Sequence, residues 1–152
     1  MDISEIFIKD CSKNLIKNGG MEDGNPPTGF IQGWDNPPVT WERSGIQKYS
    51  GNYSAHAKGC GFYHSGPRST FIKDRSYKIS FQYYLISGML DLIIYDGDGS
   101  TPLFNINYTA PIGAWTKVEK IVVSVNPGSL ATTLFLISVG EVYIDEDSVC
   151  EV

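Results

Sequence analysis

Two carboxylates near opposite ends of the chain have the type and setting for a chemical role. Glu22 follows the glycine pair Gly19-Gly20, and Asp145 lies in an apolar run close to the C-terminus. A double glycine breaks a strand and lets the chain turn. We therefore expect Glu22 to lie where the chain crosses between two layers of strands. That Asp145 lies alongside Glu22 is a hypothesis, which would join the first strand region to the last.

The elements that would position these carboxylates are predicted to be strands. The clearest is 77–85, where Ile79, Phe81 and Tyr83 alternate with other residues and should share the core face. Further strand-like segments are 39–43, 51–57, 90–95, 103–108, 115–125, 132–139 and 141–145. No window keeps a helical period. The sequence therefore predicts an all-β fold, a two-sheet antiparallel β-sandwich of the jelly-roll type.

The connections between these segments carry strong turn signals. The run Asp-Gly-Asp-Gly-Ser at 96–100 predicts a hairpin turn. It resembles part of a calcium loop but lacks the glutamate at the twelfth position, so we interpret it as a plain turn. Residues 24–38 are rich in Pro and Gly and predict a long ordered loop, which carries Trp34. We place an N-terminal arm or leading strand at 1–13 and a single domain at 14–152.

The composition excludes some classes of partner. The 152 residues carry a net charge of −5, with a pI near 4.9, and the basic residues are scattered along the chain. Nucleic acid is not an expected partner, because phosphate binding needs a concentrated basic surface. No segment reaches the roughly 18 consecutive apolar residues that a membrane span needs, so no membrane insertion is expected.

The start of the chain and its cysteines bear on location. The first residues lack the basic and apolar regions of a secretory signal, so we expect a protein made in the cytoplasm, or else a module excised from a longer extracellular enzyme. Cys11, Cys60 and Cys150 form an odd set without metal-ligand spacing. We predict free thiols, and a Cys11–Cys150 bridge remains an alternative if the terminal strands are neighbours.

A series of short motifs, each weak alone, extends along nearly the whole chain. In order, they are Asn14-Leu15, Asn18 to Glu22, Gly33-Trp34, Gly51 with Tyr53-Ser54, Tyr77 with Ile79 to Phe81, Trp115 to Val118, and Val142 to Glu146. Their order and spacing resemble the jelly-roll carbohydrate-binding modules that accompany xylanases, glucanases and mannanases. The resemblance implies a sugar-binding face and a structural calcium ion.

The resemblance also assigns residues to the ion. It implies that Glu22 and Asp145 hold the calcium, with a carbonyl from the turn at Asn52. Calcium takes six to eight oxygen ligands, so two carboxylates and nearby carbonyls would suit it. Glu146-Asp147 stands where the family usually has Asp-Val, which puts a charge at a normally apolar position. We expect that strand end to be frayed or shifted in register.

Sugar binding needs aromatic faces with hydrogen-bonding groups beside them. If Ile79, Phe81 and Tyr83 face the core, Gln82 and Tyr84 project outward. We expect Asp91 and Tyr95 to project beside them from the next strand, with Trp34 and Trp41 bordering the same face. Trp115 is predicted to belong to the core.

Catalysis finds little support in the sequence. His56 and His64 lie in no recognisable nucleophile or metalloprotease setting, and there is no GxSxG motif or phosphate-binding loop. We therefore expect a non-enzyme: a glycan-binding module whose partner is a polysaccharide or surface glycan. The alternative is a virion-surface protein, such as a phage head decoration or fibre component, that uses the same fold within a larger assembly such as a phage capsid.

Overall fold

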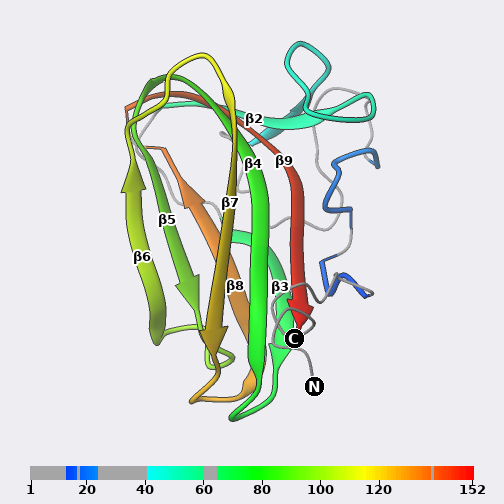
Figure 1. Cartoon of the computed structure of the whole chain (residues 1–152), viewed down its shortest axis with the longest axis vertical. Coiled ribbons are helices and arrows are strands. Elements are labelled where there is room, and N and C mark those ends of the chain that lie inside the picture. Colours follow the sequence, from blue (N-terminus) through cyan, green and yellow to red (C-terminus); the bar gives the residue numbers. More distant parts are fainter. Residues whose placement is uncertain (1–12, 17, 24–40, 60–64, 138) are drawn as a thin grey trace, which may run out of the picture.

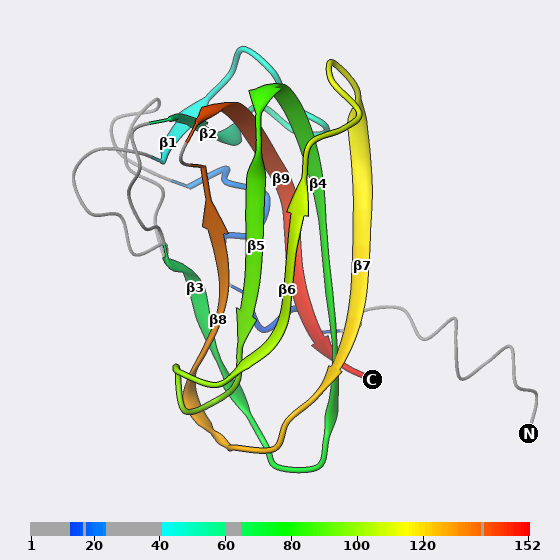
Figure 2. The same cartoon turned by 90° about the vertical axis from the view of Figure 1, so that its left-hand side faces the viewer.

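The computed structural model describes residues 13–16, 18–23, 41–59, 65–137 and 139–152. These residues form nine strands and no helix, so none of them belongs to a helix able to cross a bilayer. One sheet has the order β1 (Glu42–Ser44), β2 (Ser54–Lys58), β9 (Gly140–Glu151), β4 (Ser76–Gly88), β7 (Trp115–Val123). The other has the order β3 (Ser65–Phe71), β8 (Gly128–Leu136), β5 (Leu90–Tyr95), β6 (Pro102–Tyr108). All these pairings are antiparallel, and Figures 1 and 2 show the two layers from two directions, which confirms the predicted sandwich.

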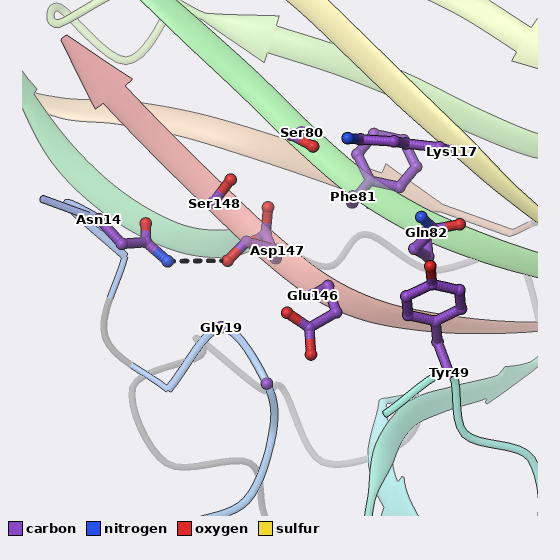
Figure 3. A pocket seen from close by; sticks show the side chains of 11 residues that line it. Asn14, Gly19, Tyr49, Ser80, Phe81, Gln82, Lys117, Glu146, Asp147 and Ser148 are labelled. Atoms are coloured by element: carbon purple, nitrogen blue, oxygen red, sulfur yellow. Dashed lines mark hydrogen bonds between the residues drawn. The ribbon is translucent and has the colours of Figure 1, made fainter. Parts of the chain in front are cut away.

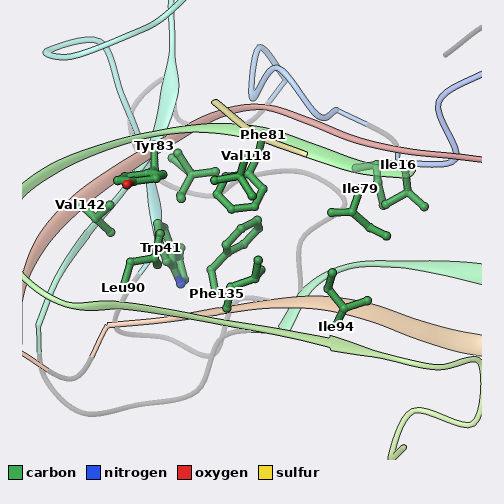
Figure 4. Packing of buried hydrophobic residues seen from close by; sticks show 14 of the residues in the cluster. Ile16, Trp41, Ile79, Phe81, Tyr83, Leu90, Ile94, Val118, Phe135 and Val142 are labelled. Carbon is green, nitrogen blue, oxygen red and sulfur yellow. The ribbon is translucent and has the colours of Figure 1, made fainter. Parts of the chain in front are cut away.

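The core lies between the two sheets. Ile79, Phe81 and Tyr83 of β4 point inward as predicted, and the ring of Phe81 meets that of Phe135 on β8 edge to face at 4.9 Å (Figure 4). Trp41 also packs on Phe135, at 6.2 Å, and is only 3% exposed. The prediction that Trp41 borders a binding face is therefore wrong, because its ring fills the core.

The chain changes sheets between β4 and β5. Gly88 has φ 77°, and a Cβ there would overlap the Val139 carbonyl oxygen, so only glycine fits this close corner. β4 ends in the five-stranded sheet, and β5 begins in the four-stranded one after a single residue, Met89. β4 and β5 are thus consecutive in sequence but do not pair with each other in a sheet.

This corner overturns one prediction about the binding face. Gln82 and Tyr84 lie on the outer side of the five-stranded sheet, whereas Asp91 and Tyr95 belong to β5 in the other sheet. Because each pair faces away from the shared core, the two pairs lie on opposite sides of the sandwich. The inward positions of β5, Leu90, Leu92 and Ile94, are buried as predicted.

The segment around Asn14 lies along β9 and ties the two ends of the chain together. The Leu15 N–H donates to the Val149 carbonyl at 2.8 Å, and the Asp147 N–H donates to the Gly19 carbonyl at 2.9 Å. The Asn14 side chain donates to the Asp147 carbonyl at 3.1 Å. A Cβ at Gly19 would overlap that same carbonyl oxygen, which explains a glycine here.

The end of β9 is not frayed. The strand continues to Glu151, and its pairing with β4 shifts register between Ser80 and Gln82, beside Glu146 with φ 54°. The predicted change of register is therefore confirmed. Cys150 is disulfide-bonded, with its partner outside the described residues, so the prediction of free thiols is wrong for this cysteine. An odd number of cysteines still allows one bridge.

Candidate functional site

A row of aromatic side chains crosses the outer face of the five-stranded sheet. The pairing of β4 with β7 places Tyr84 opposite Trp115, and their ring centroids are 5.5 Å apart. Tyr49, from the turn between β1 and β2, places its ring 5.9 Å from Trp115 and is 52% exposed. We call Tyr49, Trp115 and Tyr84 the aromatic row. It offers partly exposed ring surface on one side of the molecule.

Beside the aromatic row lies a polar hollow of about 290 Å³ (Figure 3). Its lining includes Ser80 and Gln82 of β4, Lys117 of β7, Ser148 of β9, and Asn14, Gly19 and Tyr49. The register places Gln82 opposite Lys117, one outward position along from Tyr84 and Trp115. Lys117 forms an ion pair with Glu119 at 2.8 Å. Since Tyr49 belongs to both features, the hollow and the aromatic row form one continuous surface.

Asp145 anchors the turn that carries Tyr49. Its side chain is fully buried, and Oδ2 accepts the N–H groups of Tyr49 at 2.9 Å and Ser50 at 3.1 Å. Oδ1 accepts the Glu146 N–H at 2.8 Å. Burial raises the pKa of Asp145 to about 6, against the lowering effect of these hydrogen bonds, and the Glu146 carboxylate raises it further.

Glu22 binds the other end of the same turn. Its Oε1 accepts the N–H groups of Asn52 at 2.9 Å and Tyr53 at 3.2 Å. Gly51 has φ 63°, and a Cβ there would overlap Glu22 Oε1. Arg43 donates to the Glu22 carbonyl and lies 4.1 Å from the centre of the Tyr53 ring. The carboxylates of Glu22 and Asp145 thus contact one turn from two sides.

This arrangement suits calcium in charge and ligand type but not completely. Two carboxylates flank the turn, and calcium prefers such hard oxygen ligands. The groups that face them are N–H donors, including that of Asn52, and these use lone pairs that an ion would need. Among the described residues, no three His, Cys, Asp or Glu side chains gather to hold a metal. The remaining ligands would have to be carbonyls and water.

Asp147, where the resemblance implies an apolar residue, is a buried carboxylate. It is 1% exposed, and neither carboxylate oxygen has a hydrogen-bond partner within the described part of the chain. Burial raises its pKa to about 7, against a smaller lowering effect of the Ser148 backbone N–H. Its backbone, by contrast, holds the segment around Asn14, so the residue is fixed in place.

The outer face of the four-stranded sheet is a different surface. Asp91 lies opposite Asn107, and Ile93 lies opposite Asn105. One Asp91 oxygen is buried and lacks a partner in the described residues, and burial raises the pKa of this carboxyl. Tyr95 is half-buried. Of the six predicted sugar contacts, two lie on each outer face, Trp41 lies in the core, and Trp34 lies outside the described residues.

Three residues on the outer face of the five-stranded sheet were missed by the sequence prediction. Trp115 was predicted to be core, yet it is half-buried on the outer face. The alternation of side chains along β7 indicates the outward position of Trp115. Val118 and Val122 are buried, and each lies an odd number of positions along the strand from Trp115, so the Trp115 side chain points to the opposite face. The same parity places Lys117 outward. Tyr49 had no such signal, since it lies in a turn.

His56 has the surroundings of a structural residue. Its Nε2 lies 2.8 Å from Glu141, its Nδ1 lies 3.6 Å from Glu42, and its ring stacks on Tyr143 at 4.5 Å. Both ring nitrogens therefore face carboxylates. His64 lies outside the described residues.

Comparison with known proteins places the fold. The sequence matches no protein-family model and no curated protein. A family 16 carbohydrate-binding module matches with a TM-score of 0.66 and 16% identity, over 91% of this chain and all of that one. A family 61 module, TmCBM61 in complex with β-1,4-galactotriose, gives 0.61 and 15%, over 93% of this chain and all of that one.

A third match is a part of a larger protein. The enzymatically active domain of bacteriophage CBA120 tailspike protein 4 gives a TM-score of 0.65 and 14% identity, over 91% of this chain but 21% of that one. Identities this low establish a shared fold only. The chain has the jelly-roll fold of carbohydrate-binding modules, as its motifs predicted.

Proposed function

We propose that this chain is a non-catalytic carbohydrate-binding domain whose site is the outer face of the five-stranded sheet. The observation that carries the proposal is the partly exposed aromatic row next to a polar hollow. The C–H face of a pyranose ring packs on such rings, while hydroxyls need donors and acceptors beside them. Carbohydrate-binding modules with the same fold support this assignment.

The hollow supplies suitable polar groups. The Gln82 amide has donors and acceptors for sugar hydroxyls, and the Lys117 ammonium group is a hydrogen-bond donor. Gln82 is 8% exposed, so it is largely fixed before a ligand arrives. A fixed polar group costs little entropy on binding. The expected partner is a polysaccharide or a surface glycan.

A glycan microarray followed by calorimetry tests the proposal. We expect wild type to bind at least one glycan and Trp115→Ala to bind it about tenfold more weakly, a change of about 1.4 kcal/mol. The control is Tyr95→Ala on the opposite face, which should bind as wild type does. Loss of binding in the control alone would move the site to the four-stranded sheet, and an array without any signal would reject the function.

We also propose a calcium ion at Glu22, Asn52 and Asp145. The convergence of two carboxylates on one turn supports it, as does the burial of Asp145, whose negative charge an ion would compensate. Calcium should raise the midpoint of thermal unfolding and a chelator should lower it, because a ligand of the folded state alone stabilises that state. Glu22→Gln should reduce the shift. An unchanged midpoint would reject the ion.

A second candidate function is a role on a virion surface. The match to part of a phage tailspike favours it, although such a role and glycan binding do not exclude each other. Genes encoding phage structural proteins beside this one would support the second candidate. Neighbouring genes for polysaccharide-degrading enzymes would support an accessory module instead.

A further inference from the structure

Tyr49 reaches the proposed glycan site only because its turn is folded against the sheet. The residue follows β1 in the connection to β2, and its ring lies 5.9 Å from Trp115 on β7, the far edge strand. In the order of the sheet, β2, β9 and β4 lie between β1 and β7. Something must therefore hold the turn across the sheet.

The backbone of Tyr49 is held by a strand at the centre of that sheet. Asp145 of β9 accepts the Tyr49 and Ser50 N–H groups through one oxygen, Oδ2. The Ser50 hydroxyl donates to the neighbouring Glu146 carboxylate. The backbone N–H of Tyr49 is thus bound to a fully buried side chain.

The far end of the turn has a second anchor. Glu22 accepts the Asn52 and Tyr53 N–H groups, and the close approach of its carboxylate requires the glycine at 51. With both ends bound, the turn has little freedom to swing away from the sheet. An exposed aromatic ring that is fixed before binding costs less conformational entropy to use.

We propose that Asp145 is a positioning residue for glycan binding, which holds Tyr49 over Trp115 at the mouth of the hollow. The inference rests on the proposed function, because it concerns the same site. Asp145 itself is fully buried, so its side chain would not contact the glycan. It acts through the hydrogen bonds that set where the Tyr49 ring lies.

The chain contains a matched control for this role. Asp96 is also fully buried and also accepts backbone N–H groups of a distant loop, those of Val125 at 2.8 Å and Asn126 at 2.7 Å. That loop, between β7 and β8, lies at the end of the sandwich opposite the turn that carries Tyr49 (Figure 1). Asp96→Asn therefore removes a comparable anchor without approaching the hollow.

A double-mutant cycle tests the inference. The probe is β-1,4-galactotriose, with affinities measured by calorimetry on Asp145→Asn, Tyr49→Ala and the double variant. We expect each single variant to lose about three- to tenfold in affinity, the worth of one aromatic contact. In the Tyr49→Ala background, Asp145→Asn should have no further effect, because the ring it positions is gone. Asp96→Asn should bind as wild type does.

Additive losses in the cycle would overturn the inference, since Asp145 would then act independently of Tyr49. A second measurement needs no ligand: in NMR spectra, the Tyr49 ring protons should lose their contacts with Trp115 in Asp145→Asn and keep them in Asp96→Asn. Retained contacts in Asp145→Asn would also overturn the inference. If contacts are lost but no glycan binds even wild type, the proposed function fails while the positioning of Tyr49 stands.

Discussion

Asp96 and Asp145 are both fully buried and both anchor a loop, yet the pKa of Asp96 is lowered and the pKa of Asp145 is raised. Burial raises the pKa of each. For Asp96, hydrogen bonds from four groups outweigh burial, and its pKa falls below the ordinary value of 3.8. For Asp145, burial outweighs three N–H donors, and its pKa rises to about 6.

The difference lies in what surrounds each carboxylate. The donors to Asp96 are the N–H groups of Gly97, Val125 and Asn126 and the hydroxyl of Ser124. Asp145 has one donor fewer, and the Glu146 carboxylate beside it adds a repulsive charge. The loop held by Asp96 is therefore anchored by a well-compensated charge. The turn that carries Tyr49, at the proposed binding site, has the poorly compensated one.

The largest expected effect is on stability at Asp96. Asp96→Asn should lower the free energy of unfolding by about 3 kcal/mol, because several buried donors lose a charged acceptor. With a chelator present, Asp145→Asn should cost about 1 kcal/mol, since removing a poorly compensated buried charge offsets part of the lost hydrogen bonding. Urea denaturation of both variants gives the comparison. A larger cost at Asp145 would contradict the contrast between the two anchors.

Asp147 extends the contrast to a carboxylate with no hydrogen-bond partner among the described residues. Asp147→Val should stabilise the fold by about 2 kcal/mol at neutral pH, because an apolar side chain suits a buried position better than a poorly compensated carboxyl group. The backbone hydrogen bonds of residue 147 to the Asn14 segment need no side chain and should remain. Thermal and urea unfolding measure the gain. A loss of stability would show that the carboxylate is compensated by a group or ion bound to it.

An effect of similar size is expected in the turn itself. Gly51→Ala should cost about 2 kcal/mol, because it adds backbone strain at φ 63° and a clash with Glu22 Oε1. The matched control is Gly113→Ala at φ 74°, where a Cβ meets only the Tyr84 hydroxyl at 3.9 Å, so about 1 kcal/mol of strain alone is expected. Equal costs in the two variants would mean that the Glu22 contact does not hold the turn.

The smallest effect is a pH dependence at Asp96. Because its folded pKa lies below 3.8, the folded state binds fewer protons than the unfolded state, and stability falls as acid protonates the carboxylate. The stability difference between wild type and Asp96→Asn should be constant from about pH 5 to 8 and shrink below about pH 4. Unfolding curves collected across this range measure it. A stability difference that grows in acid would contradict a lowered pKa of Asp96 in the folded state.

Alternation predicted much of the sheet but not its topology. The period of two placed Ile79, Phe81 and Tyr83 in the core, and the same rule could have placed Trp115 outside. It could not reveal that Gly88 begins a corner between sheets, because a change of sheet depends on which strands pair, not on local pattern. Asp91 was therefore assigned to the wrong face.

The candidate site was predictable in part. The family resemblance, carried in part by the glycine pair and the closing acidic segment, implied a shared role for Glu22 and Asp145, and both contact the same turn. Tyr49 lies in that turn, where neither period nor composition marks a side chain as exposed. The role of Asp96 was also hidden, since its loop partners at Val125 and Asn126 lie far along the chain.

The central claim is that a glycan binds the five-stranded face, and chemical-shift mapping tests it most directly. The protein, labelled with ¹⁵N, is titrated with the glycan that gives the strongest array signal. The account predicts the largest shifts at the backbone amides of Tyr84, Lys117 and Tyr49 and at the indole N–H of Trp115. Shifts concentrated at Asp91, Tyr95 and the other residues of the four-stranded face would contradict it.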